Sequence, residues 1–143
     1  MIVIRRAVAE VSVRPVEEQC ALRVERRLFL KRRWRGVADD GTEFGFDLES
    51  RLTNGGVVWA VPERDYVVWQ EPEVVYLVEP ESCDEAALIG WKIGNLHMPV
   101  EIRDGAVRAL HDPAVRQLLE REGWRFREES VVFRPLKVTP HAS

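Results

Sequence analysis

The stretch Val74-Val75-Tyr76-Leu77-Val78-Glu79-Pro80-Glu81-Ser82-Cys83-Asp84-Glu85 decides the fold of the second half of the chain. Its five consecutive apolar residues predict a buried, central strand. Ser82 and Glu85 then have the spacing of a capping box, in which each side chain accepts a hydrogen bond from a backbone N–H that the helix leaves unpaired. The sequence therefore predicts a strand over 74–78 and a helix over 83–96.

The rest of the second half continues this alternation of strands and helices. A hairpin over 98–103 and 106–110 comes next. A second helix follows, with Asp112 at its N-cap and Gly123 just after its last residue. A strand over 124–133 completes the order strand, helix, strand, strand, helix, strand, which is that of a ferredoxin-like domain. The residues expected on the inner face of the first helix are mostly small, so we expect very close packing on the sheet: Ala86, Ala87, Gly90, Ile93 and Gly94.

The first half of the chain shows the period of strands. We predict one strand over 28–33 and a second over 44–48, where Phe44, Phe46 and Leu48 alternate with Gly45 and Asp47, on either side of the turn signal Asp39-Asp40-Gly41. No span combines helical periodicity with helix caps. We therefore predict an α+β protein, with a small all-β domain over 1–72 and a C-terminal ferredoxin-like (βαββαβ) domain over 73–143 that ends in a short flexible tail.

Composition excludes some classes of protein. The formal net charge is −3 at pH 7, which argues against nucleic acid as the main partner. No stretch approaches the roughly 20 apolar residues of a membrane span, and the N-terminal apolar run is too short for a signal peptide. Cys20 and Cys83 match no metal-ligand spacing, and free thiols in a reducing cytosol are favoured over a disulfide. We expect a cytoplasmic protein that binds neither nucleic acid nor membrane.

Motifs of catalysis are missing from the sequence. It contains no GxSxG, GxxxxGK[ST], GxGxxG or HExxH, and no residue pair suggests a nucleophile with an orienting base. An enzyme is not expected and no catalytic residue is assigned. A dense basic run, from Arg23 to Arg35, has two interpretations. It is either the solvated face of an exposed strand, where charge prevents aggregation, or a docking surface for an acidic partner.

Of the three histidines, His97 has the most distinctive surroundings. It stands in Gly94-Asn95-Leu96-His97-Met98-Pro99, between the first helix and a proline that the helix cannot pass. The structural interpretation is a helix-terminal histidine whose positive charge suits the helix dipole. The functional one is a metal ligand, because imidazole suits nickel, copper and zinc. One imidazole is a poor site, but a two-fold axis near His97 brings two together.

The other two histidines are secondary candidates. His111 precedes the N-cap of the second helix and is either a turn residue or a further ligand. His141 lies two residues from the end, where it is either idle or completes a coordination sphere from a flexible tail.

At these residues the chain resembles the nickel metallochaperone family of urease accessory proteins known as UreE. Gly94-Asn95-Leu96-His97-Met98-Pro99 resembles the family's Gly-Asn-Arg-His-x-Pro signature, with Leu96 in place of the arginine. His111-Asp112 resembles a His/Asp element of some members. The order of elements is similar along nearly the whole chain.

The resemblance implies a protein without a catalytic step, whose β domain binds a peptide or partner. Its ferredoxin-like domain would form a homodimer and bind nickel at the dimer interface. His97 takes the place of the interfacial ligand and His141 that of the tail ligands, with His111 as a secondary candidate. Zinc or copper are alternatives to nickel. The implied partners are apo-urease and other urease accessory proteins, including a GTPase.

Two other classes of function compete with this one. The first is a protein-interaction adaptor that binds no metal and dimerises through a ferredoxin-like domain. The second is an RNA-binding domain, which requires aromatic residues on the sheet and a basic surface. The net charge of −3 disfavours the second class.

Overall fold

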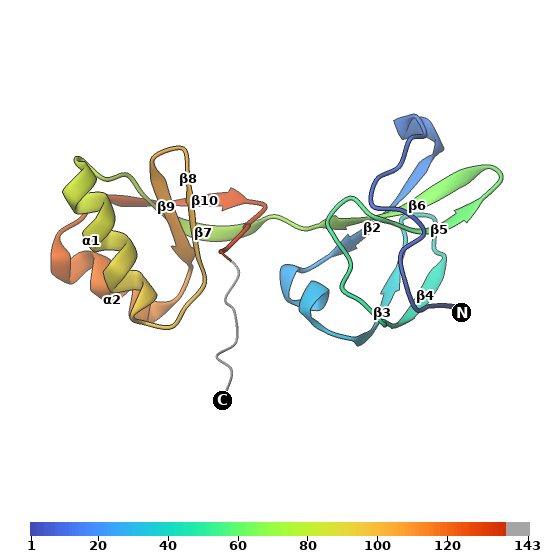
Figure 1. Cartoon of the computed structure of the whole chain (residues 1–143), viewed down its shortest axis with the longest axis horizontal. Helices are drawn as coiled ribbons and strands as arrows, with labels where there is room; N and C mark the ends of the chain where they lie inside the picture. The colour runs from blue at the N-terminus through green and yellow to red at the C-terminus, as the bar shows by residue number, and fades with distance from the viewer. Residues whose placement is uncertain (137–143) are drawn as a thin grey trace. The chain divides into compact units, whose positions relative to one another are not determined.

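The computed structural model describes residues 1–136, and the chain divides into two compact units, Met1–Glu71 and Pro72–Ser143 (Figure 1). This division falls one residue before the predicted domain boundary. The N-terminal unit contains only strands and short 3-10 helices, and the C-terminal unit combines a sheet with two α-helices, so the predicted α+β class is confirmed. None of the helices in the described part of the chain is long and apolar enough to cross a membrane.

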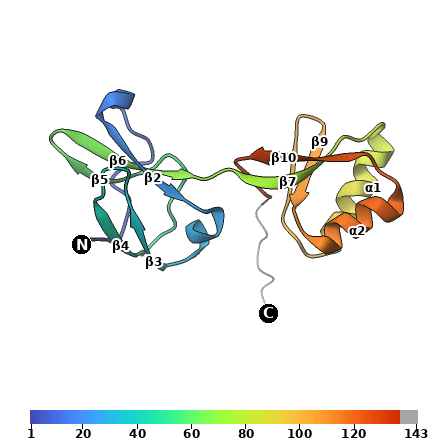
Figure 2. The same cartoon turned by 180° about the vertical axis from the view of Figure 1, so that it is seen from behind.

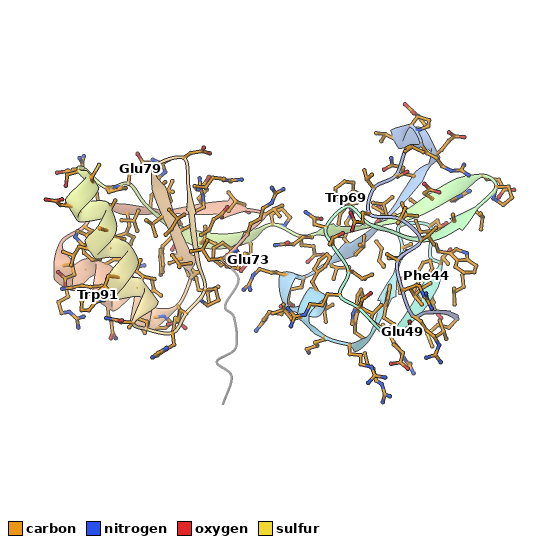
Figure 3. All side chains as sticks on the ribbon, viewed as in Figure 1. Phe44, Glu49, Trp69, Glu73, Glu79 and Trp91 are labelled. Atoms are coloured by element: carbon orange, nitrogen blue, oxygen red, sulfur yellow. The ribbon has the colours of Figure 1, made fainter. Side chains whose placement is uncertain are left out.

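The N-terminal unit is built from two three-stranded sheets that share one core. Its elements are β1 (Ile2–Ile4), η1 (Val16–Glu18), β2 (Gln19–Val24), η2 (Arg26–Leu30), β3 (Arg33–Val37), β4 (Glu43–Asp47), β5 (Val57–Val61) and β6 (Arg64–Gln70). One sheet has the order β1-β4-β3 and the other β2-β6-β5. Leu22 and Val68 of the second sheet and Phe44 of the first are fully buried in the same cluster, which lies inside this unit (Figure 3).

The two 3-10 helices correct the prediction that the first half contains only strands and turns. Residues 28–30 lie in η2, not in a strand. The reason is visible in Leu28 and Phe29, which are neighbours in sequence and both pack against the core. Successive side chains of a strand point to opposite faces, so a strand cannot bury both, whereas a tight helical turn can. The predicted return strand over 44–48 is confirmed as β4.

A network of hydrogen bonds at Asp40 fixes the turn between β3 and β4. The Asp40 carboxylate accepts from the hydroxyl of Tyr66 at 2.7 Å, the backbone N–H of Thr42 at 2.9 Å and a guanidinium nitrogen of Arg64 at 3.1 Å. The Tyr66 hydrogen bond is the largest of these influences, and together they hold the pKa of Asp40 well below its ordinary value. The ionised carboxylate therefore connects this turn to β6.

The C-terminal unit has the predicted ferredoxin-like order. Its elements are β7 (Glu73–Val78), α1 (Cys83–Gly94), β8 (Val100–Arg103), β9 (Ala106–Leu110), α2 (Pro113–Glu122) and β10 (Phe126–Val131). The sheet is antiparallel with the order β10-β7-β9-β8, so the first strand in sequence is central, as expected. Both helices cover one face of this sheet (Figures 1 and 2). Their core includes Tyr76, Ile89 and Leu119.

The helix ends follow the local sequence signals. The Ser82 hydroxyl accepts from the backbone N–H of Glu85 at 3.0 Å, and the Asp112 carboxylate accepts from that of Ala114 at 2.8 Å. Gly123 takes the left-handed conformation after α2, with φ 71°. Both predicted N-caps and this C-terminal glycine are confirmed. Helix α1 ends at Gly94, two residues earlier than predicted.

The predicted inner face of α1 was only partly right. Ile93 is fully buried, together with Ile89, but Ala87 and Gly94 are exposed. A Cβ atom added at Gly94 would meet nothing within 4 Å, and one at Gly90 would meet Ile102 at an ordinary 3.9 Å. The two isoleucines fix the rotation of the helix because they bury the most apolar area. The small residues therefore do not bring the helix unusually close to the sheet.

The segment after β10 crosses the face of the sheet that is turned away from the helices. The backbone N–H of Arg134 lies 3.5 Å from a carboxylate oxygen of Glu101. Val100, the residue before Glu101 in β8, packs into the core between the sheet and the helices. Glu101 therefore points to the opposite face of the sheet. The backbone N–H of Leu136 donates to the Val100 carbonyl at 2.8 Å. The segment thus runs from β10 at one edge of the sheet to β8 at the other, and Phe133 within it is fully buried.

Candidate functional site

His97 lies in the turn that follows α1. The backbone N–H of Asn95 donates to the Trp91 carbonyl, and those of Leu96 and His97 donate to the Ile93 and Gly94 carbonyls, each at 3.0 Å. These three bonds satisfy carbonyls that the end of the helix leaves unpaired. The chain then reverses into Met98, Pro99 and β8. His97 is exposed at this reversal.

The backbone of His97 is left-handed, with φ 58°, and Asp104 is the only other described residue besides glycines with a positive φ. This conformation costs an L-residue about 1–2 kcal/mol, although histidine, asparagine and aspartate adopt it more often than most residues. Such conformations concentrate at functional sites. Neither Gly nor Asn, the usual signals of this conformation, occupies the position.

The exposed side of α1 that leads to His97 is apolar. Trp91 lies near the end of the helix (Figure 3) and is 65% exposed, and Leu88 is 42% exposed. Ala87 and Gly94 are exposed beside them. An apolar strip of this kind is typical of a protein–protein contact. We define the apolar strip as Ala87, Leu88, Trp91 and Gly94, and the turn that contains His97 follows directly after it.

His111 lies at the end of β9, where it makes two defined contacts. Its ring stacks on that of Tyr76, with the ring centroids 4.8 Å apart. Its Nε2 lies 2.7 Å from a carboxylate oxygen of Glu128 on β10. These contacts hold the ring in a fixed orientation, so His111 has a structural role in the C-terminal unit. Glu128 was not among the predicted site residues, because the contact between His111 and Glu128 depends on the register of β7 and β10.

The structure does not bring His97 and His111 together. The pairing of Val100 with Ala109 puts both histidines at the same end of the β8–β9 hairpin. The ring of His111, however, lies over β7 and reaches β10, which is the direction away from β8. Within residues 1–136 there is no group of three His, Cys, Asp or Glu side chains that could hold a metal ion. His141 lies outside the described residues.

The two cysteines do not add to this site. Cys20 is buried in the N-terminal unit, Cys83 is exposed at the start of α1, and both are free, as predicted. Burial is the main cause that raises the pKa of the Cys20 thiol. A thiol held in its neutral form is a poor metal ligand. Neither thiol therefore adds to a site at His97: Cys20 belongs to the other unit, and Cys83 lies at the opposite end of α1.

Comparison with known proteins agrees with this fold. Residues 73–142 match the family model of the C-terminal domain of the UreE urease accessory protein. The urease accessory protein UreE of Pseudomonas putida is 33% identical over 138 residues, covering 94% of this chain and 81% of the relative. That of Bacillus cereus is 30% identical over 121 residues, covering 82% and 80%. The fold and these matches define an accessory protein and not urease itself. The chain belongs to the UreE family of urease accessory proteins.

Proposed function

We propose that this protein is a metallochaperone that binds nickel and delivers it to apo-urease during urease maturation. Its membership of the UreE family supports a role in urease maturation. The observation that carries the finer proposal is the exposed, left-handed His97 at the end of an apolar strip. Zinc and copper, which also favour imidazole ligands, are the competing ions.

The metal site is proposed to form between two protomers. One described chain supplies a single free imidazole at this place, which is too few ligands for a stable site. A two-fold axis that runs along the apolar strip and passes near His97 would bury Leu88 and Trp91 and bring the two His97 side chains together. Burial of apolar area would supply the association energy. The same homodimer thus explains both the exposed strip and the isolated histidine.

His141 is proposed as an additional ligand. The Leu136 backbone is hydrogen-bonded to Val100, which is three residues from His97. Five further residues of chain can span at most about 17 Å. His141 is therefore within reach of the proposed site. His111 is a weaker candidate, because Glu128 and Tyr76 already hold its ring.

A site of this composition suits release of the ion. It would consist of neutral imidazoles on an exposed turn, without thiolates, and such ligands exchange metal more readily than a buried cluster. Apo-urease and other accessory proteins, including a GTPase, are the proposed recipients and partners, in the cytoplasm. No catalytic step is proposed.

Nickel titration by calorimetry, with sedimentation of the same samples, tests the proposal. We compare the unaltered protein with His97→Ala and His97→Asn, because asparagine tolerates the left-handed backbone but does not replace the imidazole. We expect about one ion per dimer for the unaltered protein. Both variants should remain dimers and lose tight binding, while His111→Ala should keep it. Tight binding by both His97 variants would contradict the assignment. Absence of nickel uptake by the unaltered dimer would instead favour the adaptor.

A further inference from the structure

The outer face of the sheet β1-β4-β3 carries a second surface with defined chemistry. Cross-strand pairs place Val3 and Arg35 on either side of Gly45, and Arg33 opposite Asp47. Paired residues of neighbouring strands point to the same side of a sheet. These side chains therefore share one face, which is the face opposite the core that contains Phe44 and Phe46.

Positive charge predominates on this face. We call it the arginine face and define it by Arg5, Arg6, Arg32, Arg33 and Arg35, with the carboxylates Glu43, Asp47 and Glu49. Five cations against three anions leave an excess of two positive charges, although the whole chain has a net charge of −3. Three arginines of the basic run, Arg32, Arg33 and Arg35, lie on this face, whereas Arg23 and Arg27 pair with Asp39 and Glu25.

A single carboxylate is shared by three of the arginines. Asp47 lies 3.7 Å from Arg5, 3.2 Å from Arg32 and 3.3 Å from Arg33. Partial burial alone would raise the pKa of Asp47, but the Arg33 hydrogen bond and the neighbouring guanidinium charges outweigh it and lower the pKa. Asp47 is therefore ionised at neutral pH and still cannot neutralise three cations. Arg35 is exposed and has no ion-pair partner among residues 1–136.

Two of the arginines, Arg33 and Arg35, help to line a largely apolar hollow of about 390 Å³. The rest of its lining is Met1, Val3, Trp34, Gly45, Phe46 and Asp47. The Met1 side chain lies directly over Gly45, since a Cβ atom there would meet the thioether sulfur at 3.3 Å. Met1 is 66% exposed and Val3 57% exposed. The hollow thus offers apolar surface, which we call its floor, together with two guanidinium groups.

We propose that the arginine face docks an acidic segment of a partner protein, whose carboxylates pair with Arg33 and Arg35 and whose apolar side chain enters the hollow. Guanidinium groups bind carboxylates with two parallel hydrogen bonds, which favours them for this task. Nucleic acid fits less well. Asp47, which also lines the hollow, would repel a phosphate backbone.

This docking site is separate from the proposed nickel site. It uses no residue of the C-terminal unit. Its proposed ligand is an acidic peptide segment, whose binding does not require a metal ion. Loss of acidic-segment binding with nickel binding retained, or the reverse, therefore distinguishes failure of one proposal from failure of the other.

The test measures fluorescence anisotropy of a labelled short peptide in which pairs of Asp and Glu flank single Leu residues. The full-length protein is compared with Arg35→Glu, which breaks no ion pair, with Arg35→Lys, which keeps the charge, and with Val3→Ala, which shortens the floor. The matched control reverses one exposed arginine of the C-terminal unit, Arg121→Glu, which likewise breaks no ion pair seen among residues 1–136. Circular dichroism confirms that each variant is folded.

We expect Arg35→Glu to weaken peptide binding roughly tenfold, which is about 1.4 kcal/mol. Arg35→Lys and Val3→Ala should weaken it several-fold, and the control should leave it within twofold. Raising the salt concentration to about 0.15 M should reduce the effect of Arg35→Glu. Equal losses in the control and in Arg35→Glu would overturn the proposal, because they would show attraction to net charge alone. Stronger, Arg35-dependent binding of a single-stranded oligonucleotide would assign the face to nucleic acid instead.

Discussion

The left-handed backbone of His97 leads to a stability prediction that does not involve a metal. With φ at 58°, this residue has a conformation that glycine adopts freely and that other residues adopt at a cost of about 1–2 kcal/mol. Because the side chain is exposed, its removal loses little buried area. His97→Gly removes the backbone cost but increases the entropy of the unfolded chain, which opposes it by about 0.4–1 kcal/mol.

The balance predicts that His97→Gly stabilises the metal-free C-terminal unit by about 0.5–1 kcal/mol. His97→Asn should change its stability by less than about 0.5 kcal/mol, because asparagine tolerates the same region. His97→Val should destabilise the unit by about 1 kcal/mol or more, because a branched Cβ clashes most in this conformation. The expected order of stability is therefore Gly, then Asn and His, then Val.

Amide hydrogen exchange in a chelating buffer measures this order in the full-length protein. Peptides from α1 and β8 report the C-terminal unit, and peptides from β6 serve as an internal control, because the N-terminal unit should not respond. A stability of His97→Gly equal to or below that of His97→Val would refute the left-handed assignment. Equal changes in the β6 peptides would show that the effect is not local.

Three further predictions concern the metal site and the first unit. Nickel affinity should fall steeply between about pH 7.5 and 5.5, because imidazole ligands must be neutral and histidine ordinarily titrates near pH 6.5; isotherms that stay flat down to pH 5.5 would point to carboxylate ligands. Deletion of residues 141–143 should weaken nickel binding about 10- to 100-fold and spare the dimer, as calorimetry and sedimentation can show. Asp40→Asn should lower the stability of the N-terminal unit by roughly 1–2 kcal/mol at pH 7. The pKa of Asp40 is lower in the folded than in the unfolded protein. The stabilisation that it provides is therefore complete above the unfolded pKa and is lost progressively as the pH falls below about 4. The free energies of unfolding in urea of the variant and of the unaltered protein should thus become equal in acid.

The C-terminal unit was predictable because its signals are local. Ser82, Asp112 and Gly123 each act on backbone groups within a few residues, and the structure confirms all three. Of the five apolar residues at 74–78 all but Val74 are buried, and β7 has the predicted central place between β10 and β9. Short-range hydrogen bonds and hydrophobic pattern thus suffice for the order of elements.

Features that depend on distant contacts were not predictable. The rotation of α1 is set by Ile89 and Ile93 against the sheet, and small residues at the same spacing suggested a different face. The 3-10 helix over Arg26–Leu30 forms because two neighbouring side chains find the same core. The crossing segment that buries Phe133 follows the β10 strand without any periodic signal. To predict any of these three features, one must already know where another element of the fold lies.

The candidate metal site shows the same division. The sequence puts His97 at an element end, but only the folded unit shows that the ring of His111 points away from β8, toward β7 and β10. Residues 1–136 therefore bring no group of three metal-ligating side chains together. In the proposed site, additional ligands would come from beyond Leu136 or from a second copy. The exposed side chains of Leu88 and Trp91 favour the second copy. Leaving this apolar surface in water is unfavourable, and a symmetric dimer would cover it next to the turn that contains His97.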